Sequence, residues 1–172
     1  MNFDAALKVI LRHEGGYVHH KSDPGGRTNL GVTQATLESY LGRDVTEAEM
    51  RALKQADVAP IYRKRYWDAM RCGDLPAGLA LCVFDFGVNA GIRRGVRYLQ
   101  TMAGAAQDGL AGPGTTKAAR DFLMQHGEAE AIRRYSNARR GYYKQLPTFA
   151  TFGRGWLRRV DETETEALRL VK

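Results

Sequence analysis

The segment from residue 77 to residue 90 constrains the fold of this chain more than any other. Its sequence, Ala-Gly-Leu-Ala-Leu-Cys-Val-Phe-Asp-Phe-Gly-Val-Asn-Ala, is apolar on almost every side of a helix. A helix without a polar face is unstable on a protein surface, because it would expose apolar side chains to water. We therefore expect residues 77–90 to form a central helix that is buried by other helices.

The rest of the chain supplies helices that can surround this segment. Near the N-terminus, apolar residues recur at helical spacing: Phe3, Ala6, Leu7, Ile10 and Leu11. This spacing predicts an amphipathic helix over residues 3–13, which ends at Gly15 and Gly16. We expect further helices over residues 34–41, 93–104, 115–125, 128–145 and 156–171. Because strand signals are few, the predicted fold class is mainly α.

Polar residues mark the starts of two more helices. Thr46 and Glu49 have the spacing of a capping box, in which each side chain accepts a hydrogen bond from the backbone N–H of the other residue. We expect Asp57 to cap the next helix. That helix carries Ile61, Tyr62, Tyr66 and Trp67. Both helices belong to the first half of the chain.

A chain of 172 residues, of which 44% are hydrophobic, is large enough for one domain or for one compact unit of two lobes. We place the lobe boundary between residues 92 and 93. The formal net charge of +7 favours a polyanionic partner. Cell-wall polymers, lipopolysaccharide and nucleic acid all meet this condition.

Cysteine and histidine usage gives no sign of a disulfide framework or of a metal site. We expect Cys72 and Cys82 to be partly buried free thiols, with a single bridge between them as the alternative. His13-Glu14 begins like a zinc-protease motif, but the second histidine is missing and glycines interrupt the helix. We therefore expect no metal and no cofactor. We also expect no signal peptide and no membrane span.

Two carboxylates belong to a glycine-rich segment near the N-terminus. His13-Glu14-Gly15-Gly16-Tyr17 ends the first predicted helix, and Asp23-Pro24-Gly25-Gly26-Arg27-Thr28-Asn29-Leu30-Gly31-Val32-Thr33 follows. We expect residues 15–33 to form a loop or a short hairpin. Two carboxyl groups held close by a rigid turn are the minimal equipment for cleaving a glycosidic bond. Glycine, in turn, lets the backbone approach a bulky substrate.

These motifs resemble glycoside hydrolase family 108, whose members are phage- and prophage-type endolysins that act as N-acetylmuramidases. The similar segments are residues 14–17, 23–26, 28–33, 66–67, 83–91, 99–100, 108–115 and 152–156. The resemblance implies a lysozyme-like, helical, two-lobed single unit with a Gly-rich catalytic loop. It implies a muramidase catalytic lobe over residues 1–92 and a helical peptidoglycan-binding lobe over residues 93–172.

Glu14 is the expected general acid. It lies at a predicted helix C-terminus, where the negative end of the helix dipole disfavours the ionised carboxylate, and partial burial acts in the same direction. Both effects suit a general acid, which must keep its proton until the glycosidic oxygen accepts it. A solvated glutamate at a helix end is the structural alternative, and the family resemblance favours catalysis.

Asp23 is the expected second carboxylate and would face the oxocarbenium-like centre. Asp-Pro-Gly-Gly is also a common turn, in which the aspartate bonds to backbone amides, and both roles can hold. The order Glu, Asp, Thr is similar to that of other phage lysozymes, in which a threonine helps to place the attacking water. Thr28 or Thr33 can fill that role. We favour Thr28 and expect Thr33 among the substrate-binding residues.

Four further residues are expected to bind substrate or to support the site. Tyr17 would stack on a pyranose face and Asn29 would line the sugar groove, or the two would hold the loop onto the first helix. Asp85 and Asn89 are four residues apart on the apolar helix and so share one face. Because a buried aspartate needs partners, we expect Asp85 to anchor backbone amides of the catalytic loop, with direct catalysis as the alternative.

Two features of the second half have competing interpretations. The segment 108–113 is either a turn that contacts glycan or peptide, as the resemblance implies, or a helix–helix connector. Bases and aromatic residues alternate at Arg133, Arg134, Tyr135, Arg139, Arg140, Tyr142, Tyr143, Lys144, Arg158 and Arg159. Such a pattern can bind nucleic acid. The helical spacing favours tyrosines in the core and arginines on a solvated face, attracted to an anionic envelope.

The predicted function is hydrolysis of the β-1,4 bond between N-acetylmuramic acid and N-acetylglucosamine in peptidoglycan. We expect a monomer that is made in the bacterial host cytoplasm and reaches the cell wall or periplasm by a holin-type route. One alternative is a lytic transglycosylase, which needs a single glutamate. Another is a non-catalytic module that binds the cell wall or nucleic acid.

Overall fold

The computed structural model describes residues 2–19 and 26–171 of the chain. These residues form two compact units. The N-terminal unit comprises residues 4–65, and the C-terminal unit comprises residues 66–171 together with residues 2 and 3. These packing units divide at residues 65/66, and the lobe boundary expected at 92/93 stays a prediction. The apolar segment 77–90 belongs to the C-terminal unit, because it packs with helices that follow it and with the short helix η2, Cys72–Asp74, which precedes it.

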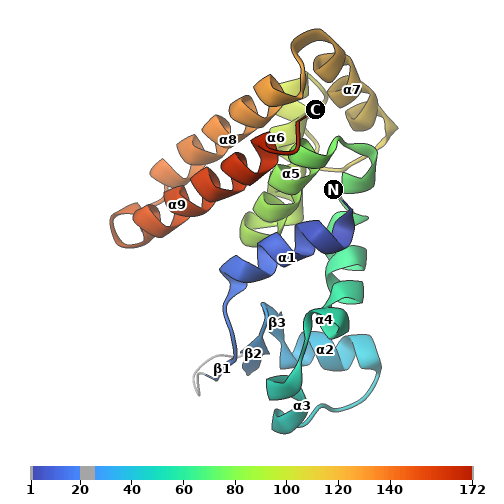
Figure 1. Cartoon of the computed structure of the whole chain (residues 1–172), viewed down its shortest axis with the longest axis vertical. Helices are drawn as coiled ribbons and strands as arrows, with labels where there is room; N and C mark the ends of the chain where they lie inside the picture. The colour runs from blue at the N-terminus through green and yellow to red at the C-terminus, as the bar shows by residue number, and fades with distance from the viewer. Residues whose placement is uncertain (1, 20–25, 172) are drawn as a thin grey trace. The chain divides into compact units, whose positions relative to one another are not determined.

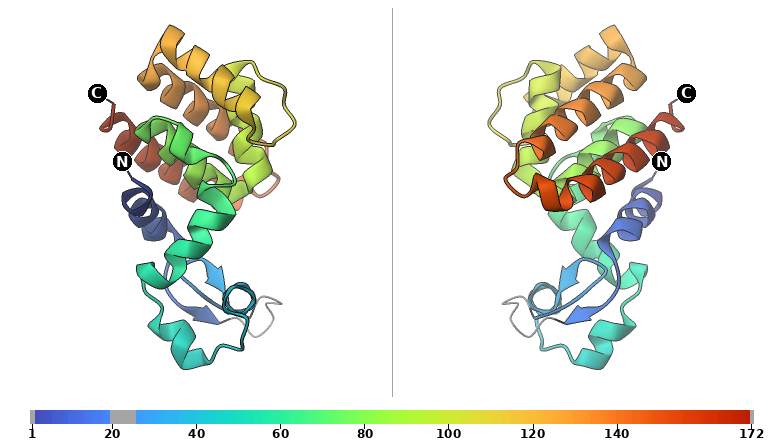
Figure 2. Two further views of the ribbon diagram at one scale, coloured as in Figure 1. Left: turned by 90° about the vertical axis from the view of Figure 1, so that its right-hand side faces the viewer. Right: turned by 90° about the vertical axis from the view of Figure 1, so that its left-hand side faces the viewer.

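The C-terminal unit is built around the predicted central helix. Helix α5, Ala77–Ala90, contacts α6, Ile92–Ala103, and also α8, Glu128–Lys144, and α9, Phe149–Leu168. Helix α7, Pro113–His126, packs on α6 and α8. Figure 1 and Figure 2 show α8 and α9 running side by side. Residues 78–87 of α5 are all buried, which confirms the prediction of a mainly α fold around this helix.

Close backbone approach explains why α5 contains glycine. A Cβ at Gly78 would lie 2.5 Å from the carbonyl oxygen of Ala167 in α9. At the same end of α5, the Glu128 carboxylate of α8 accepts hydrogen bonds from the backbone N–H groups of Gly78, at 2.7 Å, and Leu79, at 3.2 Å. A carboxylate at this place satisfies donors that a helix N-terminus leaves unpaired and complements its dipole.

The N-terminal unit contains a small sheet and short helices. Helix α1, Phe3–Glu14, contributes all but its first residue to this unit. Strands β1, Val18–His19, β2, Arg27–Asn29, and β3, Val32–Thr33, pair antiparallel in the order β1-β2-β3. The short hairpin expected within residues 15–33 is therefore present. Helices α2, Gln34–Leu41, α3, Glu47–Ala52, and α4, Gln55–Tyr62, follow.

Two predicted caps have different outcomes. The capping box of Thr46 and Glu49 is confirmed, since each side chain accepts from the backbone N–H of the other residue. Asp57 is not the residue before α4 but its third residue. Its carboxylate still accepts from the backbone N–H of Lys54, at 2.7 Å, so it caps the helix from within.

Two helices depart from the expected α-helical course. After Pro60 the chain forms a π-helix, η1, Arg63–Trp67, and Tyr66 and Trp67 lie there instead of in an α-helix. Proline lacks the N–H that an interior helical residue donates, which weakens regular winding nearby. Helix α9 begins at Phe149, earlier than the predicted residue 156. Gly153 and Gly155 lower the helix propensity of this first part, which is why the sequence signal is weak.

Both cysteines are free thiols, as predicted, and both are fully buried. Burial raises the pKa of Cys82 to about 12 and raises the pKa of Cys72 further. Neither thiol is therefore a thiolate at neutral pH, and both act as small apolar side chains. Among the helices of the described residues, none combines the length and the apolar character that a membrane crossing requires.

Candidate active site

Glu14 is the last residue of α1, at the point where the helix stops. The chain turns away there because Gly15 has a φ of 76°, a left-handed conformation that glycine adopts without steric cost. The Glu14 side chain is half-buried. Its carboxylate lies beside the turn between β2 and β3, since a Cβ at Gly31 would be 3.0 Å from Glu14 Oε2. The first carboxylate of the predicted pair thus faces a backbone without a side chain.

The turn beside Glu14 has a strained but well-supported conformation. Leu30 and Gly31 connect β2 to β3 with φ values of 49° and 72°. Positive φ at both central residues defines a type I′ turn, the hairpin turn that matches the twist of the strands. A left-handed leucine is uncommon, and the Tyr62 hydroxyl supports it by donating to the Leu30 carbonyl, at 3.0 Å. A Cβ at Gly31 would overlap that same hydroxyl.

The two candidate threonines lie opposite each other on β2 and β3. Directly opposed residues of an antiparallel pair project from the same face of the sheet. Thr33 is also the N-cap of α2, because its hydroxyl accepts from the backbone N–H of Thr36, at 3.2 Å, and donates to the Thr36 hydroxyl, at 3.0 Å. Thr28 has no such role in a helix cap.

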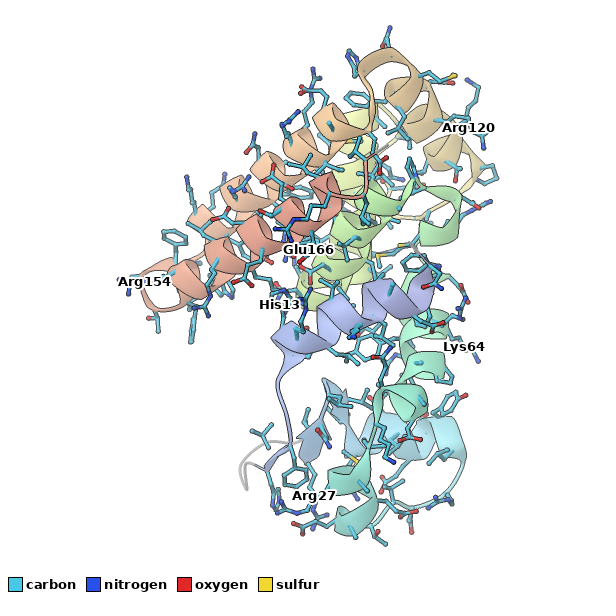
Figure 3. All side chains as sticks on the ribbon, in the orientation of Figure 1. His13, Arg27, Lys64, Arg120, Arg154 and Glu166 are labelled. Atoms are coloured by element: carbon cyan, nitrogen blue, oxygen red, sulfur yellow. The ribbon has the colours of Figure 1, made fainter. Side chains whose placement is uncertain are left out.

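Tyr17 belongs to a polar cluster centred on Glu47 of α3. The Tyr17 hydroxyl donates to Glu47 Oε1 at 3.1 Å. Arg27 of β2, which is labelled in Figure 3, donates to Glu47 Oε2 at 3.1 Å. The Arg51 guanidinium lies 4.0 Å from the centre of the Tyr17 ring and also bonds to Glu47. Hydrogen bonds from Arg51 and Tyr17 lower the pKa of Glu47. These contacts tie the loop to α3, whereas we had considered α1; sugar stacking on Tyr17 stays a prediction.

Asn29 is placed differently from our expectation of a groove-lining residue. It is 5% exposed, and its amide donates to the backbone carbonyls of Met50, at 2.7 Å, and Arg51, at 3.4 Å. Asn29 shares a pair with Val32, on the face of the sheet opposite to Thr28 and Thr33. It therefore joins the sheet to the end of α3 and offers little surface to a sugar.

Asp23 lies outside the described residues, so the second carboxylate of the predicted pair has no described position. Asp85 and Asn89 belong to the C-terminal unit. Asp85 is fully buried and bonds to side chains of α8 and α9, where we expected backbone amides of the loop. Arg139 pairs with it at 2.6 Å and Arg159 at 2.8 Å. Among the described residues, the partners of Asp85 are Arg139, Arg159 and, at 3.4 Å, the Thr163 hydroxyl, and not loop amides.

The Asp85 network also corrects the expectation that the arginines of α8 and α9 are solvated. Arg139 is 1% exposed, and it bonds to the hydroxyl of Tyr143, which in turn donates to Asn89. Burial opposes ionisation of Asp85, but Arg139 and Arg159 outweigh it and hold the pKa of Asp85 below its ordinary value. Arg133 and Arg134 are exposed as predicted, and Tyr135 and Tyr143 are core residues.

The segment 108–113 is held by hydrogen bonds to the side chain of Gln100 in α6, which is 1% exposed. The Gln100 amide donates to Asp108 at 2.7 Å and to Thr115 at 2.9 Å, and its oxygen accepts from the backbone N–H of Gly109 at 2.9 Å. These bonds give the segment the role of a connector between α6 and α7. A glycan contact at this turn stays a prediction of the family resemblance.

Sequence reasoning missed three residues that shape the candidate site: Arg27, Glu47 and Tyr62. Arg27 was visible as a cation inside the glycine-rich segment, and Glu47 as an acid in the first turn of a capped helix. Their opposite charges favour an ion pair, but the two residues are far apart in the sequence, so the sequence does not show that they meet. The sequence pattern predicts Tyr62 only as a core residue of a helix, since no neighbouring residue indicates a hydrogen bond to Leu30.

Comparison with known proteins agrees with this fold. Residues 7–91 match the family described as glycosyl hydrolase 108, and residues 94–161 match a family described as a predicted peptidoglycan domain. The structure of Brucella abortus SagA is similar over 98% of this chain and 94% of that chain, with 40% sequence identity and a TM-score of 0.80. No curated protein matches.

The fold and these matches define a mainly α, lysozyme-like glycoside hydrolase that degrades peptidoglycan. More narrowly, the chain belongs to the glycosyl hydrolase 108 family. This membership excludes a non-catalytic binding module, which was one of the alternatives from the sequence.

Proposed function

We propose that the protein is an N-acetylmuramidase that hydrolyses the β-1,4 bond between N-acetylmuramic acid and N-acetylglucosamine, with Glu14 as the general acid. The observation that carries this proposal is the position of Glu14. Its carboxylate ends a helix and packs against the backbone of Gly31, 3.0 Å from where a Cβ there would lie, so the glycine lets the carboxylate keep this position. It also falls within the segment that matches the hydrolase family.

In the proposed mechanism, protonated Glu14 donates to the glycosidic oxygen as the bond to the leaving sugar breaks. Asp23 is the proposed second carboxylate, which stabilises the positive charge that develops on the sugar ring. Thr28 is the proposed residue that orients the water. The N-cap role of Thr33 supports this choice, because the Thr33 hydroxyl proton is already donated to Thr36.

The decisive experiment replaces Glu14 by glutamine, which keeps the shape but cannot donate the proton. We expect Glu14→Gln to fold normally and to clear purified sacculi about 10²–10⁴-fold more slowly, the usual contribution of general acid–base catalysis. Glu162→Gln, an exposed change in α9, is the matched control and should retain activity. A folded Glu14→Gln protein with near-normal activity would remove Glu14 from the mechanism.

Asp23→Asn tests the second carboxylate through two measurements, activity and melting temperature. Loss of activity at unchanged Tm supports a catalytic Asp23, whereas a large fall in Tm beside the loss of activity supports a turn-forming role. Unchanged activity would take Asp23 out of the site.

A lytic transglycosylase uses the same acid and differs in its product. It forms an anhydro sugar without consuming water, so mass spectrometry of the released fragments separates the two reactions. We expect reducing ends that have gained water. Anhydro ends would replace the hydrolase by the transglycosylase while leaving Glu14 in place.

We further propose that the enzyme acts as a monomeric endolysin, made in the bacterial cytoplasm and released to the wall through a holin-type pore. The substrate class supports the place of action, since peptidoglycan lies beyond the cytoplasmic membrane. Expression with a holin should lyse cells, and expression without one should not. Lysis in both cases would contradict the route.

We propose that the basic surface assists recruitment to the anionic envelope. The net charge of +7 supports this, and exposed arginines such as Arg93, Arg97 and Arg133 are suited to it. Binding to sacculi should weaken with salt, because the Debye length falls to about 8 Å at physiological ionic strength. Binding to sacculi that does not change across a salt series would exclude charge as the recruiting force. Tighter binding to duplex DNA than to sacculi would favour nucleic acid as the partner.

A further inference from the structure

An exposed aromatic surface lies on one face of α9 in the C-terminal unit. Phe152, Gly155 and Trp156 are spaced i, i+3 and i+4, so they share that face. Phe152 is 54% exposed, Trp156 is half-buried, and the two rings lie 5.7 Å apart. We refer to these three residues as the Phe152–Trp156 surface. The exposed phenylalanine ring and the half-buried tryptophan ring together give this face of α9 an apolar contact surface.

The surface is backed by a rigid support. Trp156 stacks on Tyr143 with ring centres 5.2 Å apart and planes at 23°, and Tyr143 is 2% exposed. Because one face of the indole lies on a buried ring, its accessible part is the opposite face and edge. Tyr143 is itself held by the Arg139 guanidinium, at 3.2 Å, and Arg139 is held by Asp85. The indole is therefore fixed before any ligand arrives.

Gly155 has no packing reason for its missing side chain. A Cβ at this position would meet nothing within 4 Å, and glycine inside a helix costs about 1 kcal/mol relative to alanine. Gly153, by contrast, is filled by the Phe149 ring. The open place at Gly155, between Phe152 and Trp156 on the same face, lets a flat ligand approach the backbone of α9.

Polar groups beside the surface fit a sugar. Asn89 is exposed, and its amide oxygen accepts from the hydroxyl of Tyr143, the ring under Trp156. Its amide nitrogen, which carries two donors, has no partner among the described residues and can donate to a hydroxyl or an acetyl oxygen.

We propose that the Phe152–Trp156 surface, with Asn89 at its edge, is a glycan-binding subsite for a pyranose ring of a peptidoglycan strand. The C–H groups on one face of a pyranose form an apolar patch that packs on an aromatic ring, while its hydroxyls need donors at the rim. This inference rests on the proposed function for the identity of the sugar.

The test is a binding titration with peptidoglycan glycan strands freed of their stem peptides by an amidase, in the full chain carrying Glu14→Gln. Trp156 is one of two tryptophans, and the other, Trp67, is 7% exposed, so a fluorescence change reports on this surface. We expect Phe152→Ala to weaken binding about tenfold, the loss of roughly one stacking contact. Asn89→Ala should weaken it less, and Trp156→Phe should bind without the fluorescence change.

Tyr40→Ala is the matched control, because Tyr40 is 47% exposed in α2 of the other unit. Equal affinities of Phe152→Ala, Asn89→Ala and the parent would overturn the subsite while the hydrolase assignment stands, since sacculus hydrolysis by the wild type is measured separately. Two other outcomes would overturn the proposal, both with strand binding intact in Phe152→Ala. If this variant no longer binds phosphatidylglycerol vesicles, the surface contacts a membrane. If it no longer self-associates, the surface contacts a second copy of the chain.

Discussion

One ion pair from each unit shows that charged side chains in this molecule are held in two opposite ways. In the N-terminal unit, the pair between Arg27 and Glu47 joins side chains that are 28% and 41% exposed. In the C-terminal unit, the pair between Arg139 and Asp85 joins side chains that are 2% and 0% exposed. Exposed pairs add little stability because water and salt screen them. Breaking a buried pair leaves a charge without compensation and is costly.

This difference decides how the activity of a polar variant is interpreted in each unit. A polar substitution near Glu14 changes local geometry and leaves the fold intact, so activity reports on the site. A polar substitution beside α5 changes the stability of the unit, so activity there must be read together with Tm. The same type of amino-acid change therefore has a different meaning on the two sides of residue 65.

The largest effect is expected for Asp85→Asn. The change removes the counter-charge of buried Arg139, and we expect the free energy of unfolding to fall by about 3–5 kcal/mol. Urea denaturation measures this. Asp161→Asn is the control, because Asp161 also pairs with an arginine, Arg140, but its side chain is 60% exposed. Equal losses in the two variants would show that burial does not distinguish the pairs.

Acid should reproduce part of that loss in the wild type. The folded pKa of Asp85 lies below its ordinary value of 3.8, since the two arginines outweigh the effect of burial. The unfolded chain therefore takes up this proton first as pH falls, and the stabilisation present above 3.8 is lost between 3.8 and the folded pKa. Tm should fall in this range. In Asp85→Asn, the part of the Tm decrease that comes from protonation of Asp85 should be missing. The same dependence of Tm on pH in both proteins would refute this contribution of Asp85.

Gly31→Ala should damage activity more than stability. Alanine in the left-handed conformation costs about 1–2 kcal/mol, and its Cβ would also displace the Tyr62 hydroxyl and the Glu14 carboxylate. A misplacement of about 1 Å in a catalytic group can cost roughly 10²-fold in rate. Gly42→Ala pays the same conformational cost in open space and is the matched control. Should both variants lose activity equally, the contact with Glu14 is irrelevant.

Tyr17→Phe is expected to give the smallest effect of the four. It removes the hydrogen bond to Glu47 but keeps the ring under Arg51, so Tm should change by a few degrees at most. Activity should fall modestly if the loop must be held against α3. Tyr40→Phe, in an exposed tyrosine of α2, serves as the control. A Tm loss as large as that of Asp85→Asn would erase the contrast between the two units.

Much of the fold could be predicted because it follows from local pattern. The all-round apolar composition of residues 77–90 predicts a buried helix, and Thr46 with Glu49 predicts a cap, whatever lies elsewhere in the chain. The start of α9 could not be predicted, since Gly153 is explained only by the Phe149 ring beside it. Local sequence holds propensity, and packing between helical turns overrides it.

The candidate site could be predicted only in part for a related reason. The position of Glu14 at a helix end follows from the glycines after it. The partners of Asp85 do not follow, because Arg139 and Arg159 come from two distant helices and resemble ordinary surface arginines in a helical pattern. Asn29 was misplaced because an asparagine in a strand gives no sign of which carbonyls it will reach.

The position of α5 has a consequence for how such enzymes can be divided and recombined. The hydrolase family segment ends at residue 91, after α5, yet α5 is packed inside the unit formed by the following helices. A fragment cut after residue 91 would carry a helix with no polar face but would lack α6, α8 and α9, which pack on it, and it should aggregate. Grafting a different wall-recognition part onto this hydrolase therefore requires a junction near residue 65, with α5 exchanged as a portion of the recipient.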